Sequence, residues 1–433
     1  APSSKFFNAS KEKITMDGQR EAREDFLAQI SSINEEKNDN GKAQSENEQL
    51  HSIKQKLKRH YQSQDKLAPL FDDPEQSIHT CYVRLALLTQ QQFQKQKDKM
   101  TNNQGHEKNE EENGKWPNSL DYSLIYGNQT EHIELQDIWN DKQNQSKIHH
   151  TSIRGEAGSG KSVLSQRIAH LWGNDQMWNH QFQYLLHIPL RIIINAFHHI
   201  NDNCDDEKKD ESNDDIEYLW SIIVNELHIP QWNLNDTKCM INSMNGLLLI
   251  LDGFDEIANE IQNNTNLKAW LQHCTSNQKY SIIMTSRPNA MCEYLNNPRM
   301  LNVIGFQSQD IQNYINAYFK NNKESNILMK KLNNNRSLKL LSHTPLYLRL
   351  FCYLSRQDNS NHEKWDEMTL SQLYETLLKS YMKWNWMKLN GLNKLNNDKI
   401  LNIFEMEMDY LSQIAWEGLK CGQAIISCEI QQR

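Results

Sequence analysis

A glycine-rich segment at residues 155–162 carries the clearest chemical signal in the sequence. It reads GEAGSGKS and matches the pattern G-x-x-x-x-G-K-[ST]. Glycines let the backbone curl so that successive N–H groups point at phosphate oxygens, and a helix that begins there adds the positive end of its dipole. In such a loop the lysine binds the β- and γ-phosphates and the serine hydroxyl binds Mg²⁺. The segment therefore predicts a P-loop for ATP, or a closely related nucleoside triphosphate, formed by Gly155, Glu156, Ala157, Gly158, Ser159, Gly160, Lys161 and Ser162.

A hydrophobic run that ends in acidic residues, GLLLILDGFDEI at 246–257, supplies the metal side of such a site. Asp252 stands at the end of this predicted strand, where its carboxylate can hold Mg²⁺ through a water molecule. Asp255 and Glu256 follow after a glycine, where a carboxylate can orient or deprotonate an attacking water. Two acids so close together cannot both be assigned as the base, and the sequence leaves that choice open.

Arg287 follows a third hydrophobic run, YSIIMTSRP at 280–288. The carboxyl edge of a parallel sheet is where ligands gather. A guanidinium at that edge can bind the γ-phosphate and so distinguish a triphosphate from a diphosphate. We therefore expect Arg287 to act as a phosphate sensor.

The hydrophobic pattern also predicts the elements that must position these residues. Runs rich in Ile and Leu predict strands at 150–155, 182–192, 246–252 and 280–286, and helical spacing predicts helices at 161–173 and 216–228. Strands that alternate with helices in this way are typical of a parallel sheet with helices on both faces. After Phe306 the segments have helical spacing. The predicted fold is an α/β P-loop NTPase with a three-layer parallel-sheet core, followed by one or more helical domains.

The first 117 residues are polar and rich in Asn, Gln, Asp, Glu and Lys. A short amphipathic helix is predicted between residues 50 and 62, and the region as a whole is expected to be helical and partly disordered. The stretches 90–116 and 201–215 carry little that a core could bury. We expect the first to be disordered or a surface excursion, and the second to be an acidic, solvated loop.

The composition limits the kinds of partner that the protein is expected to bind. The chain has 433 residues and a formal net charge of -8 at pH 7. Such a chain is not built to follow a phosphate backbone, so no nucleic-acid partner is expected. Its eight cysteines form no C-x-x-C pair, which is typical of reduced thiols in an intracellular protein. No segment approaches the roughly 20 apolar residues of a membrane span and no signal-peptide pattern is present, so we expect a cytoplasmic protein without a membrane span.

Taken in order, GEAGSGKS, LLLILDGFDE and YSIIMTSRP resemble the NACHT domain of the STAND class of P-loop ATPases. The resemblance covers about residues 120–430. SHTPLYLRLFC at 342–352 looks like the helical-domain segment whose proline, here Pro345, approaches the adenine. The resemblance implies that Asp252 is the Walker B acid, that Asp255 and Glu256 complete a D-G-x-D-E pattern, and that Arg287 is the sensor arginine. It also implies a cycle in which an ADP-bound closed state opens on ligand sensing, exchanges to ATP and oligomerises.

These observations predict four regions. They are an N-terminal region at 1–117, a nucleotide-binding α/β core at 118–306, a helical domain at 307–400, and the start of a winged-helix-like or second helical region at 401–433. The leading hypothesis is a slow ATPase switch that uses ATP, ADP and Mg²⁺ and controls self-association or binding of a protein partner, in innate-immune-like or host-interaction sensing. Two alternatives stay open: a P-loop ATPase of another class, such as an AAA+-like remodeller, and a nucleotide-binding scaffold without turnover.

Overall fold

The computed structural model of the chain describes residues 42–73, 75–82, 85–103, 133–139, 148–201, 213–242, 246–357, 365, 368–390 and 404–420. These residues form two compact units. The first contains the described residues up to Asp65, together with Ser77–Ile311 and His343–Leu346. The second contains Lys66–Gln76, Gln312–Ser342 and the described residues from Tyr347 onwards.

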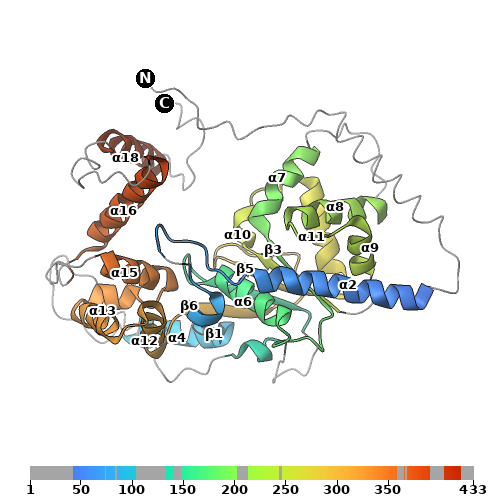
Figure 1. The fold of residues 1–433 in the computed structure, drawn as a ribbon, viewed down its shortest axis with the longest axis horizontal. Helices are drawn as coiled ribbons and strands as arrows, with labels where there is room; N and C mark the ends of the chain where they lie inside the picture. The colour runs from blue at the N-terminus through green and yellow to red at the C-terminus, as the bar shows by residue number, and fades with distance from the viewer. Residues whose placement is uncertain are drawn as a thin grey trace. The chain divides into compact units, whose positions relative to one another are not determined.

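A six-stranded sheet forms the centre of the first unit (Figure 1). Its strands are β1 (Ala86–Thr89), β2 (His150–Arg154), β3 (Tyr184–Pro189), β4 (Leu247–Asp252), β5 (Tyr280–Ser286) and β6 (Arg299–Gly305). The order across the sheet is β1-β6-β2-β5-β4-β3, and all pairs are parallel except β1 with β6. Every residue of β4 and β5 is buried, which explains the apolar run of β4 and the apolar centre of β5. Strand β5 therefore lies between the strand that leads into the P-loop and the strand that ends in Asp252.

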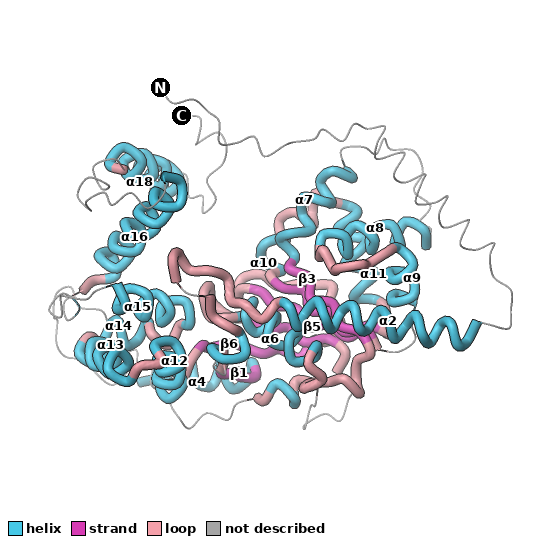
Figure 2. Tube along the Cα trace, viewed as in Figure 1, coloured by secondary structure: helices cyan, strands magenta, loops and turns pink. Residues whose placement is uncertain are grey.

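Helices cover the sheet of the first unit, and Figure 2 shows the strands among them. They are α2 (Lys42–Ser63), α3 (Ile78–Cys81), α4 (Gln90–Asn103), α6 (Lys161–Gly173), α7 (Leu190–Asn201), α8 (Asn213–Glu226), α9 (Leu234–Asn242), α10 (Phe254–Ile257) and α11 (Thr265–Ser276), with a short 3₁₀ turn, η1 (Leu135–Asp137). Helix α6 packs on β3, β4 and β5, and α11 packs on β5. On α11, Trp270 packs edge-on against Trp220 of α8, which in turn packs against Tyr280 of β5.

The predicted amphipathic helix between residues 50 and 62 is present as part of α2, and its apolar face is buried against α6. Tyr61 also covers the edge of the sheet. Its hydroxyl accepts a hydrogen bond from the N–H of His187 at 2.9 Å and donates one to the carbonyl oxygen of Leu185 at 3.3 Å. Both partners belong to β3, the last strand of the sheet, so Tyr61 satisfies backbone groups that an edge strand would otherwise expose.

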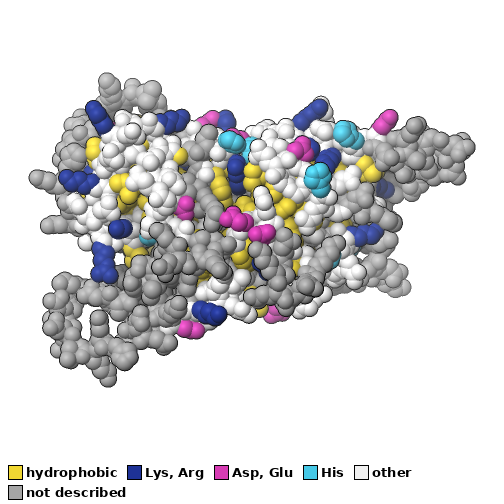
Figure 3. All heavy atoms as spheres, turned by 90° about the horizontal axis from the view of Figure 1, so that it is seen from below, with side chains coloured by type: hydrophobic (Ala, Val, Ile, Leu, Met, Phe, Trp, Pro, Cys, Tyr) yellow, Lys and Arg dark blue, Asp and Glu magenta, His cyan; other side chains and the backbone are white. Residues whose placement is uncertain are grey.

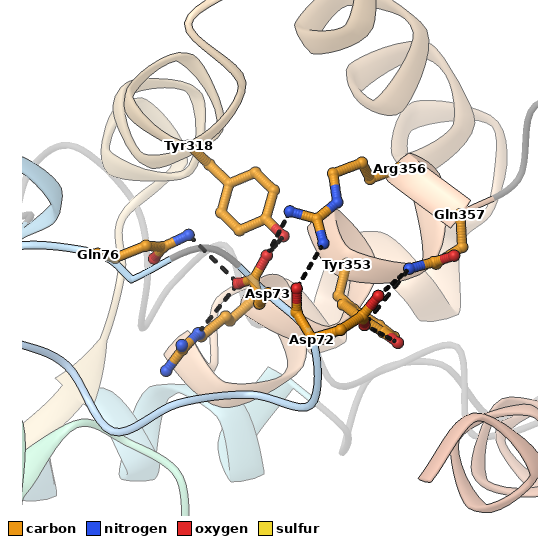
Figure 4. Close-up of polar contacts among 8 residues, drawn as sticks. Asp72, Asp73, Gln76, Tyr318, Tyr353, Arg356 and Gln357 are labelled. Atoms are coloured by element: carbon orange, nitrogen blue, oxygen red, sulfur yellow. Dashed lines mark hydrogen bonds and ion pairs between the residues drawn. The ribbon is translucent and has the colours of Figure 1, made fainter. Parts of the chain in front are cut away.

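The second unit is helical. It contains most of α12 (Ser308–Phe319), together with α13 (Asn322–Asn334), α14 (Arg336–Leu341), α15 (Pro345–Gln357) after its first two residues, α16 (Leu370–Asn390) and α18 (Glu405–Lys420). The segment Lys66–Gln76 is held among these helices by two adjacent acids (Figure 4). Asp73, whose side chain is fully buried, accepts hydrogen bonds from Tyr318 and Arg356, and Asp72 accepts one from Tyr353.

The structure confirms the α/β P-loop class and corrects three local predictions. The predicted strand at 182–192 is too long, because β3 ends at Pro189 and Leu190 begins α7. The strands β1 and β6 were not predicted. Of the acidic stretch predicted to be a loop, Asn201 ends α7 and residues 213–215 begin α8, while residues 202–212 lie outside the described residues. In the predicted winged-helix-like or second helical region, Glu405–Lys420 form α18, and residues 401–403 and 421–433 lie outside the described residues.

The prediction that residues 90–116 are disordered or a surface excursion is wrong for Gln90–Asn103, which form α4 and pack on β1 and β6. Residues 104–116 lie outside the described residues. Gln and Lys are good helix formers, and Thr89 caps the helix. Its hydroxyl accepts a hydrogen bond from the N–H of Gln92 at 3.2 Å, and the Gln92 side chain accepts one from the N–H of Thr89 at 2.8 Å. This reciprocal pair is a capping box. Phe93 then packs on the sheet beside Ala86 and Leu88.

Candidate nucleotide-binding site

The loop at 155–160 connects β2 to α6 and has the backbone shape that a phosphate cradle needs. Gly158 and Gly160 have φ angles of 75° and 94°, which residues other than glycine rarely adopt. Gly155 is required for another reason. A Cβ there would lie 2.6 Å from Ser159 Oγ and 3.0 Å from the carbonyl oxygen of Val303. The glycines of the motif therefore correspond to real steric demands of the fold.

Lys161 begins α6, and its ammonium lies inside the loop. Nζ donates hydrogen bonds to the carbonyl oxygens of Gly155 at 2.7 Å and Glu156 at 2.9 Å. Partial burial lowers the pKa of Lys161, and the nearby carboxylates of Asp255 and Asp252 oppose that shift. The ammonium is thus bonded to the loop and lies near enough to both acids for their charges to act on it.

The donor set of the loop fits a phosphate chain. The N-terminus of the 13-residue helix α6 opens on it and supplies backbone N–H groups and a positive dipole end. Ser159 is buried, and its Oγ has no hydrogen-bond partner within the described residues. The hydroxyl of Ser162, by contrast, belongs to an exposed residue in the first turn of α6. The loop therefore offers N–H and O–H groups that can donate hydrogen bonds to phosphate oxygens.

Asp252 is buried at the carboxyl end of β4, and two hydroxyl groups hold it. Thr285 Oγ1 donates a hydrogen bond to Asp252 Oδ1 at 2.5 Å, and Ser165 Oγ donates one to the same oxygen at 3.3 Å. Gly253 follows with a φ of 85° and starts the short helix α10, which carries Asp255 and Glu256. The left-handed glycine explains how the chain turns sharply from the strand into this helix.

Asp255 and Arg287 bind each other. Asp255 Oδ1 accepts a hydrogen bond from the backbone N–H of Arg287 at 3.1 Å, and Oδ2 lies 3.0 Å from Arg287 Nε. The guanidinium remains more than half exposed. Glu256 lies one residue further along α10 on the exposed side, and partial burial raises the pKa of its carboxyl, while the charge of Arg191 lowers it. The two acids that the sequence could not separate therefore have different surroundings.

Pro345 lies against the P-loop. Its Cγ is 3.6 Å from the position that a Cβ on Gly160 would occupy. The next residue, Leu346, donates its backbone N–H to the carbonyl oxygen of Gly158 at 3.2 Å. The stretch His343–Leu346, which contains both residues, is also bonded to the end of β6. The N–H of Phe306 donates a hydrogen bond to the carbonyl oxygen of His343 at 2.8 Å. The structure thus places Pro345 beside the P-loop, and the contact with adenine that the resemblance implies stays a prediction.

Three contact residues of the site were not predicted. Thr285 and Ser165 hold the carboxylate of Asp252, and Leu85, which precedes β1, would contact a Cβ on Gly160 at 2.9 Å. Thr285 stands two residues before Arg287 in the same motif, so its place at the strand end was readable. Ser165 and Leu85 left no comparable signal, because a serine in a helix and a leucine in an apolar run have many ordinary uses.

One face of the molecule carries charged side chains of both signs (Figure 3). Figure 3 shows one face of the molecule, on which the lysine and arginine side chains of the described residues lie apart from one another, with acidic side chains between them. Within the described residues, no helix has the length and apolar character that spanning a lipid bilayer demands.

A mostly parallel sheet, a glycine loop between β2 and α6, and an acid at the end of β4 define the fold as that of a P-loop NTPase. Residues 149–322 match the family model of the NACHT domain. The chain therefore carries a NACHT domain, and the resemblance seen in its three motifs is confirmed.

The relatives that match are NACHT, LRR and PYD domains-containing proteins. The chain is 22% identical over 275 residues to NACHT, LRR and PYD domains-containing protein 12 of Mus musculus, covering 59% of this chain and 24% of that protein. It is 22% identical over 259 residues to NACHT, LRR and PYD domains-containing protein 3 of Rattus norvegicus, covering 54% of this chain and 21% of that protein. The alignments thus span less than a quarter of the first two relatives' length. Among solved structures, the Aeropyrum pernix ORC1 protein in complex with DNA matches with a TM-score of 0.31 and 11% identity, over 62% of this chain and 79% of that chain.

Proposed function

We propose that this protein is a NACHT-type ATPase switch that binds ATP and ADP with Mg²⁺, hydrolyses ATP slowly, and controls its own association or the binding of a protein partner through its nucleotide state. The observation that carries the proposal is the strand order. Because β2, β5 and β4 are neighbours, Lys161, Arg287 and Asp252 follow the same edge of three adjacent strands. The residues to which we assign phosphate binding, phosphate sensing and metal binding thus lie at or just after neighbouring strand ends, which supports the proposal.

We assign each residue of the site a role in nucleotide binding or hydrolysis according to its surroundings. Lys161 and the loop N–H groups bind the phosphates, while Ser162 and, through water, Asp252 hold Mg²⁺, which neutralises charge on the phosphate oxygens when bound. Asp255 is engaged with Arg287, so we assign it the task of orienting the sensor. Glu256 is left as the group that accepts a proton from the attacking water, since its raised pKa suits a base better than an ordinary carboxylate.

Pro345 and Leu85 lie against Gly160 and supply apolar surface beside the phosphate loop. We assign this surface to the adenine, a flat, weakly polar base. The similarity to NACHT, LRR and PYD domains-containing proteins supports a role as a switch in a sensing pathway of the cytoplasm, of the innate-immune or host-interaction kind.

Equilibrium binding of labelled ATP to the Lys161→Ala variant tests the proposal. Loss of the charged hydrogen bonds to phosphate is worth about 1.5–3 kcal/mol, so affinity should fall about tenfold to a hundredfold. Lys279→Ala, an exposed lysine before the opposite end of β5, is the matched control and should bind as the wild type does. Undiminished affinity in Lys161→Ala would contradict the P-loop assignment.

The nucleotide that leaves the purified protein on denaturation separates the switch from a scaffold without turnover. Bound ADP in protein loaded with ATP indicates hydrolysis, whereas ATP alone indicates a scaffold. Turnover that DNA or RNA accelerates would indicate a remodeller or motor of another P-loop class.

A further inference from the structure

Thr285 occupies a position between two elements of the site. It is 1% exposed and is the penultimate residue of β5, the strand that ends just before Arg287. Its Oγ1 accepts a hydrogen bond from the backbone N–H of Gly253 at 2.9 Å and donates one to Asp252 Oδ1 at 2.5 Å. A hydroxyl has a single proton. Since the Gly253 N–H approaches Oγ1 as a donor, that proton is committed to the carboxylate.

The second hydroxyl reaches the same carboxylate oxygen. Ser165 Oγ donates to Asp252 Oδ1 at 3.3 Å from α6, one helical turn after Ser162. Within the part of the chain that the structure describes, both donors therefore lie on Oδ1, and Oδ2 receives neither of them. The two bonds fix the rotation of the carboxylate and leave Oδ2 as the oxygen available to a metal-bound water.

Thr285 also holds the turn that follows Asp252. Gly253 is the left-handed residue from which α10 starts, and α10 carries Asp255, the partner of Arg287. By holding the N–H of Gly253, Thr285 connects the position of that turn to β5. A valine would keep the shape of the side chain, but it would leave this half-buried N–H without its acceptor and Asp252 without its nearest donor.

From this geometry we infer that Thr285 is a positioning residue for the Mg²⁺-nucleotide complex, which acts by orienting the carboxylate of Asp252. The inference rests on the proposed function. Groups that hydrogen-bond a metal-binding carboxylate typically contribute about tenfold to a hundredfold to metal affinity. Thr285 should accordingly affect binding of nucleotide with Mg²⁺ far more than binding of nucleotide alone.

The test is a titration of a fluorescent, slowly hydrolysed ATP analogue against the full chain, first in EDTA and then at increasing Mg²⁺. For Thr285→Val we expect the affinity in EDTA to stay within about twofold of wild type, while the Mg²⁺ midpoint rises about tenfold or more. Thr285→Ser keeps the hydroxyl and should restore the wild-type midpoint. Thr275→Val is the matched control, because Thr275 is also buried in the first unit but bonds only to carbonyl oxygens of its own helix α11.

An unchanged Mg²⁺ midpoint in Thr285→Val would overturn the inference, as would an equal shift in Thr275→Val. A wild-type protein that binds no nucleotide, with or without Mg²⁺, would instead overturn the proposed function and the inference with it. If Thr285→Val does not fold, as judged by circular dichroism, Thr285→Ala carries the same measurement, because the smaller side chain leaves room for a water at the N–H of Gly253.

Discussion

The backbone N–H of Leu346 donates a hydrogen bond to the carbonyl oxygen of Gly158, across nearly 190 residues of sequence. The stretch His343–Leu346 belongs to the first unit, although the residues on both sides of it belong to the second. Gly305 makes this placement possible. Its φ is 98°, and a Cβ there would lie 2.3 Å from the carbonyl oxygen of His343.

Gly305→Ala should therefore displace His343–Leu346 from the P-loop. The left-handed backbone alone costs about 1–2 kcal/mol for alanine, and the clash adds to it. We expect lower stability in urea unfolding and faster nucleotide release in stopped-flow fluorescence. Gly246→Ala is the control, since that glycine also has a positive φ but precedes β4 at the far end of the strand from Asp252. It should lose stability while releasing nucleotide at the wild-type rate; equal release rates in both variants would contradict the role of Gly305.

Arg287→Ala should weaken ATP binding about tenfold or more and leave ADP binding nearly unchanged, because a sensor of the γ-phosphate meets only the triphosphate. Calorimetric titration with both nucleotides measures the ratio. Arg336→Ala, an exposed arginine of the second unit, should leave both affinities intact. Parallel losses for ATP and ADP in Arg287→Ala would show that Arg287 does not sense the γ-phosphate.

The pH dependence of hydrolysis should report on Glu256. Its pKa is raised above the usual carboxyl value, chiefly by burial, and a base works only when deprotonated. Turnover should therefore increase as the pH rises through that raised pKa. Arg191 is the charge that lowers the pKa most, so Arg191→Gln should move this acidic limb to higher pH. Lys268→Gln, on the exposed side of α11, should not move it. A limb that stays in place in Arg191→Gln, or that survives in Glu256→Gln, would exclude Glu256 as the base.

Two adjacent acids allow a matched test of the second unit. Asp73 is fully buried and lies 2.8 Å from Arg356 Nη1, whereas Asp72 is exposed. Breaking a buried ion pair costs about 3–5 kcal/mol, and losing an ordinary hydrogen bond, such as the one that Asp72 accepts from Tyr353, costs about 1 kcal/mol. Asp73→Asn should therefore accelerate hydrogen exchange throughout α12 and α15, while Asp72→Asn should change it little. Similar exchange in the two variants would show that the buried pair does not stabilise this unit.

Much of the candidate nucleotide site could be predicted because each of its parts is a short, continuous segment of sequence. Strands β2 and β5 and helix α6 begin and end within one residue of their predicted bounds. Each of them begins or ends at a motif whose residue types are limited by the chemistry expected there. The separation of Asp255 from Glu256 was not predictable. It depends on the ion pair of Asp255 with Arg287, which lies 32 residues away in sequence.

The missed parts depend on distant pairing. Strand β1 has only four residues and pairs antiparallel with β6, more than 200 positions later. Asp73 lies in a polar stretch whose partners, Tyr318 and Arg356, are about 250 to 280 residues away. Helix α4 is different, because its capping pair, Thr89 and Gln92, was readable from the sequence. The low hydrophobicity of the stretch outweighed that local signal.

The strand order has a mechanical consequence. Hydrogen bonds join β5 to β2 on one side and to β4 on the other, so the distances between the three strand ends are fixed by ladders that do not stretch. In the proposed switch, a change from triphosphate to diphosphate would not be registered by sliding these strands apart. Among the described residues of the site, the half-exposed side chain of Arg287 and the stretch His343–Leu346 lie outside these ladders. The proposed switch would therefore have to amplify small displacements at these two places, against a rigid frame.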